Sequence, residues 1–186
     1  NFHDPLFFYN KRTIFSFYFC SILIFLLGVY DDKYDIKFTS KFICQLVIIS
    51  LTILIDQRLV ISHLNFYYLS ESIELFNLSI PFTIISIIIF INALNYFDGI
   101  DLLCICYSFT IFLILFILGI FQIFSLIIMI SLIFLFVLNY KNKLFLGDSG
   151  STLLASIISI LMIKSYNENS LLNLEQVLVI LFLPVL

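Results

Sequence analysis

Three short polar segments interrupt an otherwise apolar chain, and together they hold most of its aspartates. They read YDDKYD at 30–35, NALNYFDGID at 92–101 and LFLGDSGS at 144–151. None contains His or Cys, and carboxylate and amide oxygens suit Mg²⁺ or Mn²⁺ better than Zn²⁺. Because Mg²⁺ leaves positions for water and substrate phosphate, the segments predict a magnesium site that receives a phosphate ligand. Six of the chain's eight aspartates lie in them: Asp31, Asp32, Asp35, Asp98, Asp101 and Asp148.

The first segment ends an uncharged run at 13–30. Carboxylates at the C-terminal end of a helix face the negative end of its dipole, at a cost of roughly 0.3–1 kcal/mol each. Lys41 lies nine residues beyond Asp32, where it can snorkel or neutralise a phosphate, and Gln45 follows one turn later on the same side. We therefore expect the aspartate pair to serve chemistry.

The middle segment carries more polar residues than a turn requires. Asn92, Asn95 and Asp98 are spaced by three, so they line one side of a helix end, and Asp101 follows beyond Gly99. An ordinary Asp-Gly turn explains Asp98 and Gly99 alone. Asparagines in the last turns of an apolar span are costly and usually functional, so we expect a site here.

The third segment looks like the GDSGG of serine proteases, but a triad needs a nearby His, and His3 and His63 are predicted across the membrane. The segment can instead start a helix at a glycine turn. Asp148 and Ser149 would then cap it, with N–H groups free for an anion. Taken alone, the octapeptide is explained equally well by an ordinary helix cap.

The elements that position these segments are predicted to be membrane helices. The chain is 62% hydrophobic and 11% charged, with a mean hydropathy of +1.17. Such composition indicates an all-α polytopic membrane protein. The apolar runs predict a bundle of about seven spans in one domain over 1–186. We expect this chain to be an interior fragment of a longer protein. The mixed stretch between the second and third runs predicts either a strand pair or an interfacial segment. The apolar runs are 13–30, 42–55, 80–97, 102–118, 121–138, 151–163 and 176–186.

The order of the runs predicts that all three polar segments share one membrane face. Two runs separate each segment from the next, and an even number of crossings returns the chain to the same side. Five lysines on that face against four basic residues opposite indicate that it is cytoplasmic.

A net charge of −3 without a basic patch argues against binding of nucleic acid. The four cysteines lie in apolar runs without a CxxC pair, which indicates buried small hydrophobes.

Together, GVYDD with Lys41 and Gln45, NALNYFDGID and FLGDSGS resemble the three signature segments of the polyprenyl-phosphate N-acetylhexosamine-1-phosphate transferases, glycosyltransferase family 4. The resemblance covers about residues 20–186 and is closer to the WecA-like branch than to the MraY branch. It implies attack of undecaprenyl phosphate on a UDP-sugar, with release of UMP. It also implies a multi-pass protein of the bacterial inner membrane with cytoplasmic active-site loops, and it leaves a homodimer open.

The resemblance also implies roles for particular residues. The aspartate pair would lie where the lipid phosphate enters, and the acids of the middle segment would shape the nucleotide and metal site. The resulting assignments are metal ligands Asp148 and Asn95, catalytic Asp31, Asp32, Asp98 and Asp101, and substrate-binding Lys41, Asn92, Gly147 and Ser151.

Two departures from the family pattern affect these expectations. The family usually has a glycine after the last Asp of the middle segment, where this chain has Leu102, which bears on the role of Asp101. The chain also stops before the histidine-containing loop that helps bind the nucleotide sugar, so we expect this piece alone to be inactive.

Two other functions stay open from the sequence. One is an MraY-like transferase acting on UDP-N-acetylmuramoyl-pentapeptide. The other is a cation or proton transporter, which would place acids at mid-span and pair them across helices.

Within the transferase hypothesis, the lipid phosphate is a monoester with a second pKa of about 6, so at pH 7 it is mostly dianionic and a base has few protons to remove from it. The aspartate pair is therefore predicted to act mainly by holding metal, water or Lys41.

Overall fold

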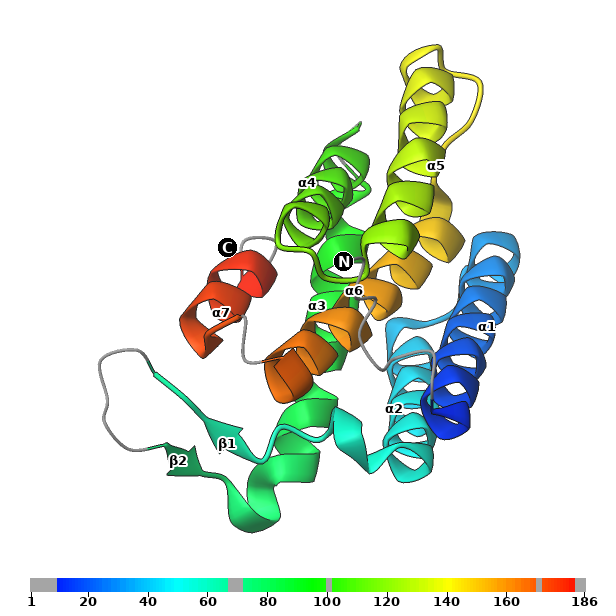
Figure 1. Cartoon of the computed structure of the whole chain (residues 1–186). Coiled ribbons are helices and arrows are strands. Elements are labelled where there is room, and N and C mark those ends of the chain that lie inside the picture. The colour runs from blue at the N-terminus through cyan, green and yellow to red at the C-terminus, as the bar shows by residue number, and fades with distance from the viewer. Residues whose placement is uncertain (1–9, 67–71, 100–101, 170–171, 183–186) are drawn as a thin grey trace.

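The computed structural model describes residues 10–66, 72–99, 102–169 and 172–182, and they form a helical bundle (Figure 1). Its seven α-helices correspond one to one with the seven predicted apolar runs. They are α1 (Lys11–Tyr34), α2 (Phe38–Ile55), α3 (Ser79–Phe97), α4 (Leu103–Ile117), α5 (Gln122–Tyr140), α6 (Gly147–Asn169) and α7 (Leu174–Phe182).

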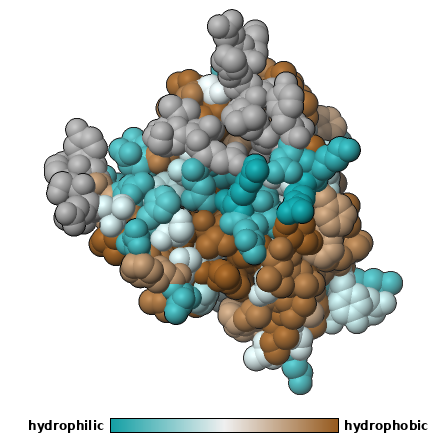
Figure 2. All heavy atoms as spheres, turned by 60° about the horizontal axis from the view of Figure 1, so that its bottom comes forward, coloured by the Kyte–Doolittle hydropathy of each residue, from teal (hydrophilic) through white to brown (hydrophobic). Residues whose placement is uncertain are grey.

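Five helical segments in the described residues are long and apolar enough to cross a membrane, namely α1, α2, α3 with the preceding 3-10 turn η3 (Phe76–Leu78), α5 and α6. The helix α4 is apolar but shorter, with 15 residues. Apolar side chains cover the sides of the bundle, whereas hydrophilic residues gather on the end turned toward the viewer in Figure 2. The structure thus confirms the expected all-α polytopic membrane protein.

Helix α6 lies in the middle of the bundle, between α1 and α3 (Figure 1). Of its apolar window, 83% is buried, against 17–39% for the other four candidate spans. Small residues line it, which lets neighbouring backbones approach closely, as in other membrane helix interfaces. Their hydroxyls bond to carbonyls of the preceding turn, so they satisfy their own polar atoms. These buried serines are Ser151, Ser156, Ser159 and Ser165.

The connection from α2 to α3 contains a 3-10 turn, η2 (Gln57–Leu59), and a two-stranded antiparallel sheet, β1 (His63–Leu64) and β2 (Ile73–Glu74). Of the two alternatives predicted for this stretch, the strand pair is confirmed. The Tyr166 hydroxyl donates to the His63 carbonyl and accepts from the Asn65 N–H, both at 2.8 Å. The C-terminal part of α6 therefore anchors the hairpin.

All four cysteines are free. Cys20 and Cys104 are buried, as predicted, whereas Cys44 and Cys106 are exposed, so the expectation of burial is wrong for these two. In a bundle surrounded by lipid, an apolar run buries only the face that meets other helices, and composition alone does not identify that face.

Candidate active site

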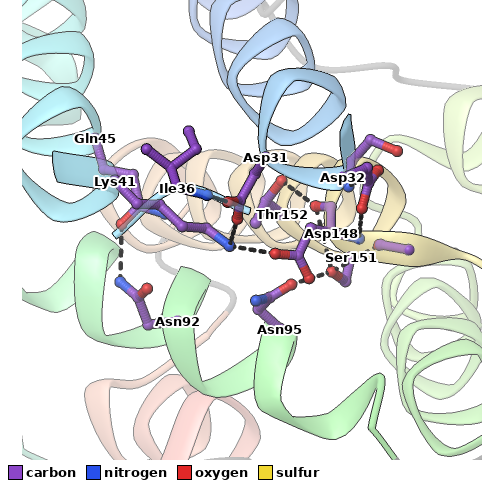
Figure 3. A network of polar contacts seen from close by, with 12 residues as sticks. Asp31, Asp32, Ile36, Lys41, Gln45, Asn92, Asn95, Asp148, Ser151 and Thr152 are labelled. Atoms are coloured by element: carbon purple, nitrogen blue, oxygen red, sulfur yellow. Dashed lines mark hydrogen bonds and ion pairs between the residues drawn. The ribbon is translucent and has the colours of Figure 1, made fainter. Parts of the chain in front are cut away.

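The ends of three helices meet at a cluster of one lysine and two carboxylates, in which the lysine and one carboxylate are buried and the other carboxylate is partly exposed (Figure 3). Lys41, in the first turn of α2, directs Nζ to Asp31 Oδ2 of α1 and to Asp148 Oδ2 of α6, each at 2.6 Å. Lys41 and Asp31 are only 6% and 7% exposed. Because a buried charge is costly unless paired, this mutual contact is what allows the cluster to exist.

The turn between α1 and α2 orients Asp31. The Asp35 backbone is left-handed, with φ 49°, and its N–H donates to the Asp31 carbonyl at 2.8 Å, which ends α1. The following Ile36 N–H donates to Asp31 Oδ1 at 2.8 Å. Both carboxylate oxygens of Asp31 therefore have partners, one from the backbone and one from Lys41.

Asp32 caps the start of α6. Its Oδ1 accepts the Asp148 N–H at 2.8 Å and its Oδ2 accepts the Ser149 N–H at 3.1 Å. Gly147 precedes them with φ 68°, and a Cβ there would lie 3.2 Å from both Asp32 oxygens. The expectation that these N–H groups stay free for an outside anion is therefore wrong for these two. A carboxylate 116 residues earlier binds them, which no octapeptide can reveal.

Asn95 adds a fourth helix, α3, to the cluster. The amide orientation that satisfies its neighbours directs Nδ2 to Asp148 Oδ1 at 3.1 Å and Oδ1 to Lys41 Nζ at 3.2 Å. The Ser151 hydroxyl lies 2.5 Å from the same amide. One turn deeper, Asn92 bonds to Gln45 of α2 at 2.8 Å. The predicted polar side of the α3 end thus faces α2 and α6.

An open cleft of about 370 Å³ adjoins this cluster, lined by Asn95, Tyr96, Asp98, Gly99 and Asp148. Burial raises the pKa of Asp98 to about 6; the charges of Asp148 and Asp32 also raise it, and a hydrogen bond from the Gly147 backbone lowers it. The cleft is acidic, because the carboxylates of Asp98 and Asp148 line it and Lys41 is the one ammonium group of the adjoining cluster.

A divalent cation suits this donor set. Asp98 and Asp148 line the cleft with carboxylate oxygens, which Mg²⁺ prefers, and Asn95 could add its amide oxygen by turning it from Lys41. Among the described residues, no three His, Cys, Asp or Glu side chains gather closely enough to hold a metal by themselves. That is compatible with Mg²⁺, which commonly takes one or two carboxylates and completes its shell with water and phosphate.

The structure brings most of the predicted site residues together. The contacts above join all three polar segments at one end of the bundle, which confirms the prediction that they share a face. Asp101 lies outside the described residues. Two features were not predicted, the capping of α6 by Asp32 and the Gln45–Asn92 bond. Spacing had put Gln45 on the right side of its helix, but nothing in the sequence named its partner.

Fold and site together define a multi-pass helical membrane protein with a lysine–carboxylate–amide cluster at one end of the bundle. The family model for glycosyl transferase family 4 matches residues 14–166. The chain belongs to this family.

A protein of Bacillus subtilis (strain 168) is 29% identical over 173 residues, covering 89% of this chain and 48% of that protein. It is named "Probable undecaprenyl-phosphate N-acetylglucosaminyl 1-phosphate transferase". The chain spans about half the length of this relative.

Proposed function

We propose that the protein transfers a sugar 1-phosphate, N-acetylglucosamine 1-phosphate, from a UDP-sugar to a polyprenyl phosphate, undecaprenyl phosphate. The observation that carries the proposal is Lys41 held between Asp31 and Asp148 beside an open acidic cleft, in a chain of glycosyl transferase family 4. The name of the B. subtilis relative supports the choice of lipid and sugar. The alternative substrate is a UDP-N-acetylmuramoyl-pentapeptide, as in the MraY branch.

The proposed reaction exchanges one phosphoanhydride bond for another and leaves the phosphoesters of the sugar and the lipid intact. A lipid phosphate oxygen attacks the sugar-proximal phosphorus of the UDP-sugar and forms a new P–O–P bond. The bond from that phosphorus to the bridging oxygen breaks, and UMP leaves with that oxygen. Such transfers gain mainly from positioning and from stabilisation of negative charge, so a site rich in fixed charges and amides suits them.

The chain's own residues would supply the positioning. Lys41 is the cation of the cluster, and its two carboxylate partners fix its Nζ behind Asp148, which lines the cleft. Asp32 fixes the start of α6 and with it Asp148. Because the lipid phosphate is mostly dianionic at pH 7, we propose that Asp31 and Asp32 act by holding these groups, rather than as general bases.

Mg²⁺ or Mn²⁺ would be held by the carboxylates of Asp148 and Asp98, which fit the oxygen preference of these ions. Asn95 would join them by turning its amide oxygen from Lys41 toward the ion. When bound, the ion would neutralise charge on the diphosphate. We further propose that the cluster faces the cytoplasm of a bacterial inner membrane. That is the side where UDP-sugars are made.

The experiment is an assay of UMP release by the full-length protein purified in detergent. It contains UDP-N-acetylglucosamine, undecaprenyl phosphate and Mg²⁺, with a parallel reaction in EDTA. We expect release that EDTA abolishes and that Asp148→Asn lowers at least about a hundredfold, since a ligand and a partner of Lys41 are lost together. The matched control is Asp35→Asn, because Asp35 is exposed in the same turn as the aspartate pair and Asn tolerates its left-handed backbone.

The outcomes separate the parts of the proposal. Release from UDP-N-acetylmuramoyl-pentapeptide instead of UDP-N-acetylglucosamine would keep the reaction and replace the sugar. Release that persists in EDTA would contradict the metal requirement. No UMP with either UDP-sugar, from a protein that is folded by its thermal transition, would contradict the transferase.

A further inference from the structure

Helices α2 and α3 meet through two polar pairs, one turn apart. The outer pair is Lys41 and Asn95, whose Nζ and Oδ1 are 3.2 Å apart. The inner pair is Gln45 and Asn92, where Asn92 Nδ2 donates to Gln45 Oε1 at 2.8 Å (Figure 3). We propose that Gln45 and Asn92 are positioning residues, whose hydrogen bond fixes α2 against α3 and so keeps Lys41 between its two carboxylates. Only the effect on turnover rests on the proposed function.

Burying the amides of the inner pair costs free energy, so the pair must do more than occupy volume between the helices. Gln45 is fully buried, with 0% exposure, and its Nε2 has no hydrogen-bond partner among the described residues. Burying such an amide costs free energy, and a leucine of similar volume would avoid that cost. What Gln45 supplies beyond volume is its Oε1, which accepts the bond from Asn92.

The bond also has a fixed direction. Asn92 Nδ2 donates to the Ile88 carbonyl of its own helix and to Gln45 Oε1, each at 2.8 Å. Both hydrogens of this one nitrogen are thereby used, so it is bound to α3 and to α2 at once. An apolar contact at this depth would allow α2 to slide or turn.

Because the inner and outer pairs lie one turn apart on the same helix faces, the Gln45–Asn92 bond also constrains the position of Lys41. Residues 41 and 45 are four apart and residues 92 and 95 are three apart, so each pair of positions shares one helix face. Helix α2 also packs on α1, but only 28% of its apolar window is buried, so this bond is one of a limited number of contacts that fix its rotation. The inner bond is therefore well placed to set the direction in which Lys41 leaves α2.

The test measures how well Lys41 is held, independently of activity. Gln45→Leu and Asn92→Leu variants of the full-length protein in detergent would be methylated with formaldehyde and a borane reductant, with each lysine followed by mass spectrometry. We expect Lys41 to react about threefold to tenfold faster than in the wild type, the effect of losing one buried hydrogen bond. Lys164, buried at the other end of α6 with 1% exposure, should react at its wild-type rate.

Two further variants make the test specific. Exchanging the pair, Gln45→Asn with Asn92→Gln, keeps one long and one short amide and should restore slow labelling of Lys41. Thr83→Val removes a buried hydroxyl near the opposite end of α3, where it accepts from the Ile61 N–H at 2.9 Å. This control should leave Lys41 labelling unchanged even where it lowers the melting temperature.

The same variants give a kinetic readout. We expect kcat for UMP release to fall about tenfold while KM for the UDP-sugar stays within about twofold, because a misplaced cation affects the transfer step more than binding. Unchanged Lys41 labelling in both leucine variants, or an equal rise at Lys164, would overturn the inference. A wild-type protein that releases no UMP would contradict the proposed function. The labelling rates of Lys41 would still test the positioning role of Gln45 and Asn92, because they do not depend on activity.

Discussion

At the scale of single residues, the two aspartates at the end of α1 do different jobs. Asp31 binds Lys41 and the Ile36 N–H, whereas Asp32 accepts two N–H groups in the first turn of α6. The dipole of α1 opposes carboxylates at this position, but the positive end of α6 favours them. The unfavourable placement on one helix is thus offset by a second helix more than a hundred residues later.

Asp98 gives a prediction about stability and pH. Its pKa is raised to about 6 by burial and by Asp148 and Asp32, whereas the unfolded chain would release this proton near pH 4. A raised carboxyl pKa means that the folded state binds more protons than the unfolded state between these values. Stability from this group is therefore lost as pH rises from about 4 to 6 and stays lost above.

The measurement is the melting temperature of the wild type and Asp98→Asn in EDTA at pH 4.5 and 7. We expect the variant to gain stability relative to the wild type at pH 7, and the difference to shrink at pH 4.5. A wild type that is relatively more stable at pH 7 would contradict the raised pKa.

Residue types in the three segments were enough to predict that a site exists, and that Lys41 could be held by the aspartate pair. The individual bonds were not predictable, because their partners lie on different helices. The Lys41–Asp148 contact joins residues 107 positions apart, and the Asn92–Gln45 contact joins residues 47 apart. Only the packing of α2, α3 and α6 decides which atoms meet.

At the scale of elements, the site depends on the close approach of α1 to α6. An ideal Cβ on Gly28 would lie 2.4 Å from Ser149 Cα and 2.9 Å from the Asp148 carbonyl oxygen. These are backbone atoms, so they cannot rotate away as a flexible side chain could. Gly28 therefore lets α1 bring Asp32 within hydrogen-bonding distance of the start of α6.

Gly28→Ala should consequently separate α1 from α6. Overpacking of this kind costs about 1–3 kcal/mol, and the better helix propensity of alanine offsets about 1 kcal/mol at most. We expect a lower melting temperature and reduced UMP release, with Val29→Ala, on the exposed neighbouring position, as the control. Wild-type stability and activity in Gly28→Ala would contradict the close contact.

The sequence predicted every helix of the bundle, because apolar runs of this length have few other uses. It did not predict that α6 would be the central helix. Its many serines and glycines make it the least apolar of the five candidate spans, at hydropathy 1.3 against 2.0–2.5 for the others. In a membrane bundle, small residues mark the most buried helix because they allow close packing, which a hydropathy count does not register.

At the scale of the whole molecule, charged groups gather at the two ends. The Lys41 cluster lies at one end, and the buried Lys164 and Asp56, 3.9 Å apart, lie at the other beside the hairpin. Every acidic side chain in the described residues lies in a terminal turn of a helix or between helices. A transporter would be expected to pair acids at mid-span, so this distribution favours an enzyme acting at one membrane surface.

We propose that the aspartate pair holds Lys41 and α6 in place, and does not remove a proton. The most direct measurement is UMP release by full-length wild type, Asp31→Asn and Asp32→Asn from pH 6.5 to 9. We predict that both variants stay about a hundredfold slower than the wild type across this range, because displaced groups are not restored by hydroxide. Recovery toward the wild-type rate at pH 8–9 would contradict the claim and assign the pair the role of general base.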